Sequence, residues 1–274
     1  NEIGDFYYEP PTDFLALCTS NLPDVDIIPS EHFNTILYDD GAGAKTGVGF
    51  QPDFVWLKSR GSTYQHRLTD AVRGVTKALS SDSVNAEDTD STGLTSFDSD
   101  GFTVGADTDY CDTTGDGMVA WNWKANGAGS ANTDGDMAET VTVSANVDAG
   151  FSIVTYTGDG SAGTVGHGLS KAPEFIIVKN RDSSEHWLIF HNRINDVTDP
   201  ETDRLLFTTD IAADDSIYWN DTAPTSSVFT VGTAEETNTD DEDYIVYCFH
   251  SVDGYSKMGS YVGNSSTDGT FVYT

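Results

Sequence analysis

One apolar stretch occurs twice in this chain, and the duplication limits the folds open to it. Residues 52–60 read Pro-Asp-Phe-Val-Trp-Leu-Lys-Ser-Arg, and residues 173–181, 121 positions later, read Pro-Glu-Phe-Ile-Ile-Val-Lys-Asn-Arg. In each copy a proline precedes a short run of β-branched and aromatic residues, and a polar turn follows. This pattern is typical of a β-strand that begins with proline. The spacing is that of a whole small domain, because solenoid units are only about 20–50 residues long.

Further matches flank the duplicated strand at nearly the same spacing. The spacing changes by only a few residues, as expected when loops vary in length and strands are kept. Residues 260–263 also resemble 155–158, so a third copy begins there. We therefore expect two complete repeats and the start of a third, in a chain that is a piece of a longer polypeptide or is completed by another chain. The flanking segments 33–38, 102–105 and 119–124 correspond to 151–156, 229–232 and 245–250.

The spacing of apolar residues predicts an all-β fold of two tandem antiparallel β-sandwiches with jelly-roll-like topology. Apolar side chains follow period two almost throughout, and no segment shows a convincing helical pattern. The predicted strands are 33–38, 53–59, 64–68, 76–80, 102–104 and 118–124 in the first repeat, and 151–156, 174–179, 186–190, 204–208, 217–219, 228–231 and 244–250 in the second. The expected segments are a lead-in (1–31), a first sandwich (32–126), a polar connector with an edge strand at 140–144 (127–149), a second sandwich (150–254), and the start of a third repeat or a strand shared with a neighbour (255–274).

The charge of the chain is strongly negative. Asp and Glu number 45 against 13 Lys and Arg, which gives a formal net charge of −32. Such a surface repels nucleic acid and anionic membranes, so we expect neither as a partner. The sequence contains no run of about 18 apolar residues, the length that would predict a transmembrane helix, so we expect no membrane insertion. The acidity indicates either a salt-rich setting or a solvated surface without a special role.

The densest acidic loop, residues 107–117, is the candidate for a cation site. Calcium prefers several oxygen ligands within one turn, and this loop supplies carboxylates in that way. It lacks the bidentate glutamate that ends an EF-hand loop, and its counterpart at 238–243 has no glycine. We therefore favour a hairpin loop with Asp and Gly in their usual turn roles, keep calcium as the alternative, and expect no other cofactor.

The remaining polar motifs do not form a catalytic set. His186 and His191 would point to opposite faces of a strand, which disfavours a shared zinc ion. His167 occupies the place of Val48 in the first repeat, so we interpret it as a turn residue. There is no Gly-x-Ser-x-Gly elbow, and no Cys–His arrangement can be argued from spacing. We predict that the protein is not an enzyme and has no catalytic, cofactor-binding or metal-ligating residues.

Cysteines, basic pairs and tryptophans complete the set of candidates. Cys18, Cys111 and Cys248 are too scattered for a disulfide framework, and Cys248 should pack inside a strand. The ends of the two duplicated strands, called here the basic strand ends, hold 4 of the 13 Lys and Arg residues. These side chains could pair with acidic loops, contact a neighbouring subunit, or lie in solvent. The tryptophans should mainly pack in the core, with stacking on sugars as the alternative. The basic residues are Lys58, Arg60, Lys179 and Arg181; the tryptophans are Trp56, Trp121, Trp123, Trp187 and Trp219.

Several of these motifs resemble a known domain. They are residues 49–58, 119–124, 150–158, 165–169, 259–264 and 271–273. They resemble a β-rich domain that occurs in tandem in large virion-associated, tail- or fibre-type proteins of tailed, often marine, bacteriophages. The resemblance covers nearly all of 32–274, and residues 6–23 are similar to the end of a SPRY or concanavalin-like domain. It implies a structural or host-contact role and brings no catalytic residues.

We therefore expect a non-enzymatic virion protein, a fibre, appendage or decoration component, located in the extracellular particle. Its tandem sandwiches would present surfaces for assembly and host contact. Its partners would be other virion subunits or copies of itself, and host surface glycan is a further candidate. Three alternatives stay open at this point: a carbohydrate-binding adhesion module, a depolymerase of surface polysaccharide, and a cellular surface-layer or filament protein of a saline habitat.

Overall fold

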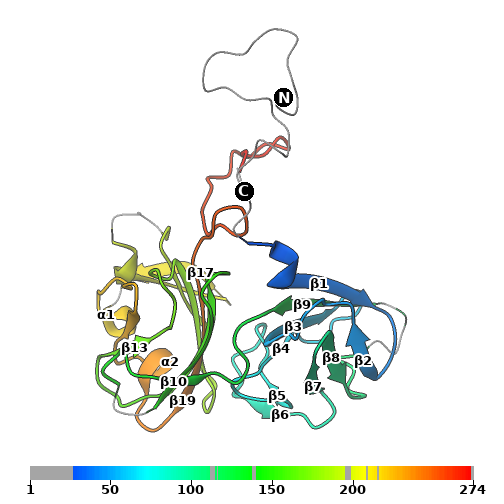
Figure 1. Ribbon diagram of the computed structural model, residues 1–274. Coiled ribbons are helices and arrows are strands. Elements are labelled where there is room, and N and C mark those ends of the chain that lie inside the picture. Colours follow the sequence, from blue (N-terminus) through cyan, green and yellow to red (C-terminus); the bar gives the residue numbers. More distant parts are fainter. Residues whose placement is uncertain are drawn as a thin grey trace, which may run out of the picture.

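The computed structural model describes residues 27–111, 115, 117–137, 140–194, 199–207, 209–214 and 216–272. These residues form two β-rich bodies that lie side by side, one built from β1–β9 and the other from β10–β19 (Figure 1). The all-β prediction is confirmed, since the sheets are antiparallel and the helices are single turns. The lead-in residues 1–26, including Cys18 and the segment similar to a SPRY domain, lie outside the described residues.

The first body contains nine strands after a short 3-10 helix, η2 (Pro29–Glu31). They form a four-stranded sheet in the order β1-β9-β3-β4, a three-stranded sheet β2-β8-β7 and the pair β5-β6. The strands are β1 (Phe33–Tyr38), β2 (Gly43–Thr46), β3 (Phe54–Ser59), β4 (Arg67–Asp70), β5 (Lys77–Ala78), β6 (Asp88–Thr89), β7 (Leu94–Asp98), β8 (Gly101–Val104) and β9 (Met118–Trp123).

The second body repeats this order and extends it. Its eight-stranded sheet runs β10-β11-β12-β19-β14-β15-β16-β17, in which β12-β19-β14-β15 corresponds to β1-β9-β3-β4, and the pair β13-β18 corresponds to β2-β8. The elements are β10 (Ser130–Asn132), β11 (Val141–Asn146), β12 (Phe151–Thr157), β13 (Gly163–Gly166), β14 (Phe175–Asn180), β15 (Leu188–His191), η3 (Pro200–Thr202), β16 (Asp203–Leu206), β17 (Thr209–Asp214), α1 (Ser216–Trp219), β18 (Val228–Val231), α2 (Glu235–Asn238) and β19 (Asp243–Phe249).

Backbone hydrogen bonds around the duplicated strand also occur in pairs. The amide of Asp53 donates to the carbonyl of Trp123, and that of Glu174 donates to the carbonyl of Phe249, each at 2.8 Å. The amide of Arg60 likewise donates to Gly117 at 2.9 Å. Its counterpart, Arg181, donates to Asp243 at 2.8 Å. This agreement in pairing order and hydrogen bonding is what a duplicated motif predicts, while the exact domain limits stay predictions.

Three details differ from the strand predictions. Residues 217–219 form the one-turn helix α1, because Asn220 and Asp221 adopt positive φ angles that end the segment in a turn. The predicted edge strand at 140–144 is β11, which lies between β10 and β12 and is therefore not at the edge. Six strands were missed, because they are short or their residues do not alternate between apolar and polar: β2, β6, β7, β10, β13 and β17.

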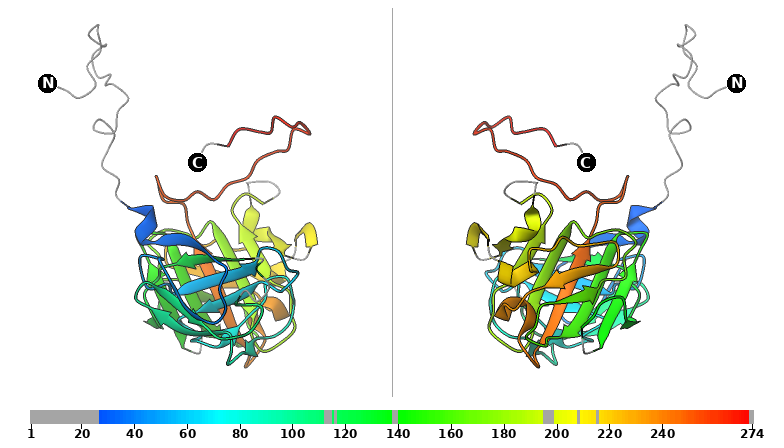
Figure 2. Two further views of the ribbon diagram at one scale, coloured as in Figure 1. Left: turned by 90° about the vertical axis from the view of Figure 1, so that its right-hand side faces the viewer. Right: turned by 90° about the vertical axis from the view of Figure 1, so that its left-hand side faces the viewer.

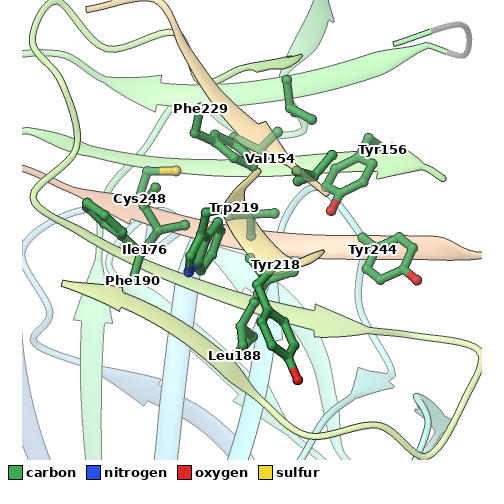
Figure 3. Packing of buried hydrophobic residues seen from close by; sticks show 14 of the residues in the cluster. Val154, Tyr156, Ile176, Leu188, Phe190, Tyr218, Trp219, Phe229, Tyr244 and Cys248 are labelled. Atoms are coloured by element: carbon green, nitrogen blue, oxygen red, sulfur yellow. The ribbon is translucent and has the colours of Figure 1, made fainter. Parts of the chain in front are cut away.

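The core of the second body lies between its large sheet and the β13-β18 pair. Side chains from β12, β14, β15 and β19 point into it, and α1 adds Tyr218 and Trp219 (Figure 3). Trp219 lies edge-on to Phe190, with ring centroids 5.8 Å apart. The first body has its own smaller core, in which Val55 and Leu57 of β3 pack against Phe102 and Val104 of β8. Each body is thus two packed layers of sheet.

Candidate functional site: the junction between the two bodies

The two bodies share a third hydrophobic core. Alternate residues of β12, β14 and β19, including Ile153, Ile177 and Tyr247, point away from the second body's own core and towards the first body. They contact Phe54, which comes from the duplicated strand of the first body. The central strands are therefore apolar on both faces because both faces are covered. The bodies form one packed block instead of separate modules on a linker.

Aromatic rings occupy the centre of this junction. Phe54 stacks on Tyr247 with ring centroids 4.2 Å apart. It also stacks on Trp123 at 5.0 Å and on Phe151 at 6.1 Å. Offset contacts of this kind add about 0.5–1.5 kcal/mol per pair beyond the area that the rings bury. Phe54 therefore stabilises the contact between the repeats. Phe175, the equivalent residue of the second copy, lies in the same cluster.

A buried ion-pair network lies beside the aromatic rings. Arg73 donates from Nε to Asp70 Oδ2 at 2.5 Å and from Nη1 to Glu87 Oε2 at 3.0 Å, and the side chains of Arg73 and Asp70 are both 0% exposed. The hydroxyl of Tyr247, from the second body, donates to Asp70 Oδ2 at 2.9 Å. Arg181 of the second body completes the network through two 3.0 Å hydrogen bonds to the carboxylate of Glu87. One side of the junction is thus fixed by charge-assisted hydrogen bonds.

The loop that carries Glu87 reaches across to the second body. The amide of Glu87 donates to the carbonyl of Arg181 at 2.7 Å. The indole Nε1 of Trp187 donates to the carbonyls of Ser80 and Ser83, at 2.9 and 3.1 Å. Residues 80–87 therefore connect the two repeats by backbone as well as side-chain contacts.

We expect this network to make stability depend on acid pH. Burial raises the pKa of Glu87, but hydrogen bonds and charges from Arg181 and Arg73 outweigh it, so its pKa lies below the ordinary value. A lowered carboxyl pKa contributes stability that is present above the unfolded-state pKa, about 4.3, and is lost as pH falls through the folded-state pKa. Urea titrations from pH 7 to pH 3 should show the destabilisation by Glu87→Gln shrinking towards zero at the acid end.

The exposed carboxylate of Asp253 supplies the control for this experiment. Asp253→Asn should leave the free energy of unfolding nearly unchanged at every pH. An effect of Glu87→Gln that stays constant down to pH 3 would show that Glu87 is not held as an ionised partner in the native state.

An apolar pocket of about 390 Å³ opens at one end of the junction. Aromatic side chains from both bodies line it, and the chain segment that follows β19 contributes Tyr255, Ser256 and Met258. The pocket is therefore bordered by the first repeat, the second repeat and the start of the C-terminal segment. The aromatic lining residues are Phe33, Phe54, Trp56, Trp123, Phe151, Phe175, Phe249 and Tyr255.

The C-terminal segment continues from this pocket as an extended arm, residues 259–272. The arm projects from one end of the molecule (Figure 2), above the place where the two bodies lie side by side (Figure 1). Its large apolar side chains face solvent: Tyr261 is 70% exposed, Val262 85% and Phe271 86%. The arm carries one charged residue, Asp268. The rest of the arm consists of small or polar residues, so the arm is a nearly uncharged segment that exposes a few large apolar side chains on a protein of net charge −32.

The basic strand ends have different roles from one another. Lys179 is fully buried and its Nζ donates to the carbonyls of Asn180 and Ser183, at 2.6 and 3.0 Å. Lys58 makes the equivalent bonds to Ser59 and Ser62, both at 2.8 Å. Burial lowers the pKa of Lys179 to about 8. The lysines thus close the turn after each duplicated strand, Arg181 joins the junction network, and Arg60 is exposed at its strand end.

His167 is buried in the loop that follows β13. Its Nδ1 accepts from the amide of Leu169 at 3.1 Å, so Nε2 carries the proton and contacts the carbonyl of Thr225 at 3.1 Å. Burial lowers the pKa of His167, which favours the neutral ring. His186 precedes β15, whereas His191 is the last residue of that strand. The prediction that the two side chains point to opposite faces of one strand therefore does not apply.

The structure also places the acidic loop, the cysteines and the tryptophans. Asp107 Oδ1 accepts from the amide of Asp109, whose carboxylate pairs with Arg67 at 2.6 Å; residues 112–114 and 116 lie outside the described residues. Among the described residues no group of three or more His, Cys, Asp or Glu side chains could hold a metal ion. Cys111 and Cys248 are both buried, and no disulfide joins them. Trp187 and Trp219 are buried in cores, whereas Trp56 and Trp123 line the junction pocket. The ring centroid of Trp121 lies 6.3 Å from that of Trp56.

The comparisons with known proteins give a family and no function. No curated protein and no solved structure matches the chain. A family model described as a domain of unknown function, DUF7483, matches residues 28–274. The match begins one residue before η2 and covers both bodies and the arm, so the two repeats and the junction lie inside one family unit. The chain therefore belongs to the DUF7483 family.

Proposed function

We propose that this protein is a non-enzymatic structural component of a virion, in a fibre, appendage or decoration, and that copies associate through the C-terminal arm. The observation that carries the proposal is the nearly uncharged arm, which exposes Tyr261, Val262 and Phe271 beside the apolar junction pocket. The resemblance of the repeat motifs to tandem domains of bacteriophage virion proteins supports the same role. In this proposal the protein is located in the particle, and its partners are copies of itself or other virion subunits.

The arm and the pocket have matching chemistry. The pocket is lined almost entirely by aromatic and aliphatic side chains, and its volume of about 390 Å³ is of the size that an aromatic side chain and its neighbours fill. Phe271 and Tyr261 are exposed rings on the arm. Burying one such ring stabilises a complex by about 2–3 kcal/mol. We therefore assign the arm of a second copy as the occupant of the pocket.

The position of the arm allows reciprocal exchange. Tyr255 and Met258 line the pocket, so each arm begins beside its own copy's binding site. Two copies that face each other at this end can place each arm in the partner's pocket, which gives a two-fold, self-complementary interface. The shared aromatic core makes each copy one stiff block, as a repeated component of a particle requires.

The charge of the protein sets the conditions for association. Two molecules of net charge −32 repel each other at low ionic strength. At about 1 M salt the Debye length falls to about 3 Å, so apolar contacts decide the equilibrium. Association through the arm should therefore strengthen with salt, whereas association through ion pairs would weaken.

Sedimentation in about 1 M salt tests this prediction. We expect wild-type protein to form dimers as its concentration rises, and the double variant Tyr261→Ser/Phe271→Ser to stay monomeric with an unchanged melting temperature. Val147→Ser is the matched control, because it removes an apolar side chain that is 43% exposed but lies outside the arm. It should dimerise as wild type does. Dimers that persist in the double variant, or a wild-type protein that stays monomeric throughout, would overturn the proposal.

Membrane association finds no support in the helices. Within the described parts of the chain, no helix has the length and apolar character needed to cross a bilayer. The acidic surface makes nucleic acid a poor partner for the same assembly, since it would repel the phosphate backbone.

A further inference from the structure

The two bodies differ at one edge of their main sheets. Strand β1 ends the order of the four-stranded sheet, and within the described parts of the chain no strand pairs with its outer edge. Its counterpart β12 lies inside the larger sheet, because β11 pairs with it and β10 pairs with β11 in turn. In the second body β11 and β10 thus cover the edge that corresponds to the open edge of β1.

The side chains of the two strands show the effect of this cover. In β12, Phe151 is 1% exposed and Ile153 is 0% exposed. In β1 every residue is half-buried or exposed, and Leu37 reaches 61%. The repeat therefore accepts an added strand at this position, and one of its two copies has none among the described residues.

The backbone of β1 directs hydrogen-bonding groups outward at every second residue. The amide of Lys124 donates to the carbonyl of His32 at 2.9 Å, so the even-numbered residues of β1 face β9 in the antiparallel ladder. Phe33, Thr35 and Leu37 therefore present N–H and C=O groups to the open edge. The amide of Thr35 donates to Asn34 Oδ1 at 2.9 Å, an exposed contact that the carbonyl of an incoming strand can replace.

Strand β1 also lacks the features by which proteins protect sheet edges. Charged residues, proline and short length discourage pairing with another chain. The other edge strands of the two large sheets have such features: β10 is three residues long, β4 contains Arg67 and Asp70, and β17 contains two aspartates. Strand β1 has six residues, Phe-Asn-Thr-Ile-Leu-Tyr, with neither charge nor proline. Among these four edges, β1 is the best suited to accept a strand.

The arm has the shape and composition of a strand donor. It doubles back on itself, since Thr270 Oγ1 donates to the carbonyl of Val262 at 2.6 Å and Asn264 Nδ2 donates to the carbonyl of Asp268 at 2.9 Å. The segments on the two sides of this turn read Ser-Tyr-Val and Thr-Phe-Val, residues that favour strands apart from the serine. Within the described residues neither segment belongs to a sheet.

The open edge begins at the junction pocket. Phe33, the first residue of β1, lines the pocket in which the proposed function places the arm of a second copy. An arm that enters the pocket beside Phe33 can continue along the strand. The arm and β1 together carry a single charge, that of Asp268, so this contact avoids most of the repulsion between two copies of net charge −32.

We propose that the arm of a second copy adds to β1 as a further strand, in the place that β11 holds on β12. The inference rests on the proposed association through the arm and names a second surface that receives it. The incoming strand pairs with the outward groups of Phe33, Thr35 and Leu37, and its apolar side chains cover Leu37. Main-chain hydrogen bonds supply affinity, while the aromatic pocket supplies specificity.

Hydrogen exchange in about 1 M salt, followed by mass spectrometry below and above the concentration of half-dimerisation, tests the proposal. In the dimer, peptides that cover 33–38 and 259–272 should exchange several-fold more slowly than in the monomer. Strand β10, an edge strand outside the proposed contact, is the control and should exchange at the same rate in both. In the variant Tyr261→Ser/Phe271→Ser neither segment should gain protection.

The substitution Thr35→Pro tests the edge directly. Proline removes an amide that faces away from β9, so β1 stays in its sheet, but an incoming strand loses a donor and meets the proline ring. The dissociation constant of the dimer should rise about tenfold. Thr35→Ala keeps the amide and is the matched control, which should dimerise as wild type does. If Thr35→Pro fails to fold, hydrogen exchange of the wild-type protein decides the question.

The possible failures can be told apart. Protection of 33–38 that is equal at both concentrations would mean that a segment of the same chain covers β1, and would overturn the inference. Dimers that Tyr261→Ser/Phe271→Ser abolishes, but in which β1 gains no protection or a folded Thr35→Pro variant dimerises as wild type does, would overturn strand addition and leave the proposed function standing. A wild-type protein that stays monomeric would overturn both.

Discussion

Replacing Arg73 by alanine is expected to lower the free energy of unfolding by about 3–5 kcal/mol. The guanidinium is 0% exposed and pairs with Asp70, also 0% exposed, and with Glu87. Without it, a buried carboxylate loses its cation and Tyr247 loses a hydrogen-bond partner at 3.2 Å. The change therefore acts on both bodies at once. Urea unfolding followed by tryptophan fluorescence measures the effect.

Arg193 provides the control for the Arg73 variant, since it is exposed. Arg193→Ala should change the free energy of unfolding by less than about 0.5 kcal/mol. If Arg73→Ala cost no more than Arg193→Ala, the junction network would contribute nothing to the native state. A second signature is the number of transitions: a junction that couples the bodies should keep unfolding in a single transition in wild type.

The second large effect is expected for Phe54→Ala, about 3–5 kcal/mol. Phe54 is 2% exposed, and its ring lies against Tyr247, Trp123 and Phe151. Alanine leaves a cavity at the centre of the contact between repeats, and rings held by two different sheets cannot easily move to fill it. Calorimetric melting should show a large fall in the melting temperature.

Phe271→Ala is the matched control for Phe54→Ala, because it makes the same chemical change at a position that is 86% exposed. In dilute protein it should leave the melting temperature almost unchanged. A small effect of Phe54→Ala, or an effect equal to that of Phe271→Ala, would mean that the two bodies do not depend on their shared core.

The duplicated strand could be predicted because its signal is local. Proline at the start, alternating large apolar side chains and a polar turn gave β3 and β14 within about one residue. The burial of both faces was also implicit in the run Phe54 to Leu57, which is apolar at every position. The sequence did not show what covers the second face, because the covering strands, β12, β14 and β19, belong to the other repeat.

The junction network and a second cavity, lined in part by Asn192 and His250, could not be predicted for the same physical reason. Arg73 and Glu87 lie in polar stretches without periodicity, and the partner that fixes Glu87, Arg181, comes from the other repeat. Asn192 and His250 become neighbours only when β14, β15 and β19 pair side by side. A comparison of the two repeats could have singled out Asn192 and His250, because the first repeat has Ala71 and Lys124 at the equivalent positions.

The shared aromatic core also determines how this protein can change over evolution. A repeat excised from the pair would present Phe54 and Trp123, or Phe151 and Tyr247, to water, and such a surface favours aggregation. We therefore expect recombination that moves a single repeat into another protein to be selected against, and gain or loss of whole pairs to be tolerated. Lengths of related polypeptides should accordingly differ in steps of two repeats, each pair inherited as a unit.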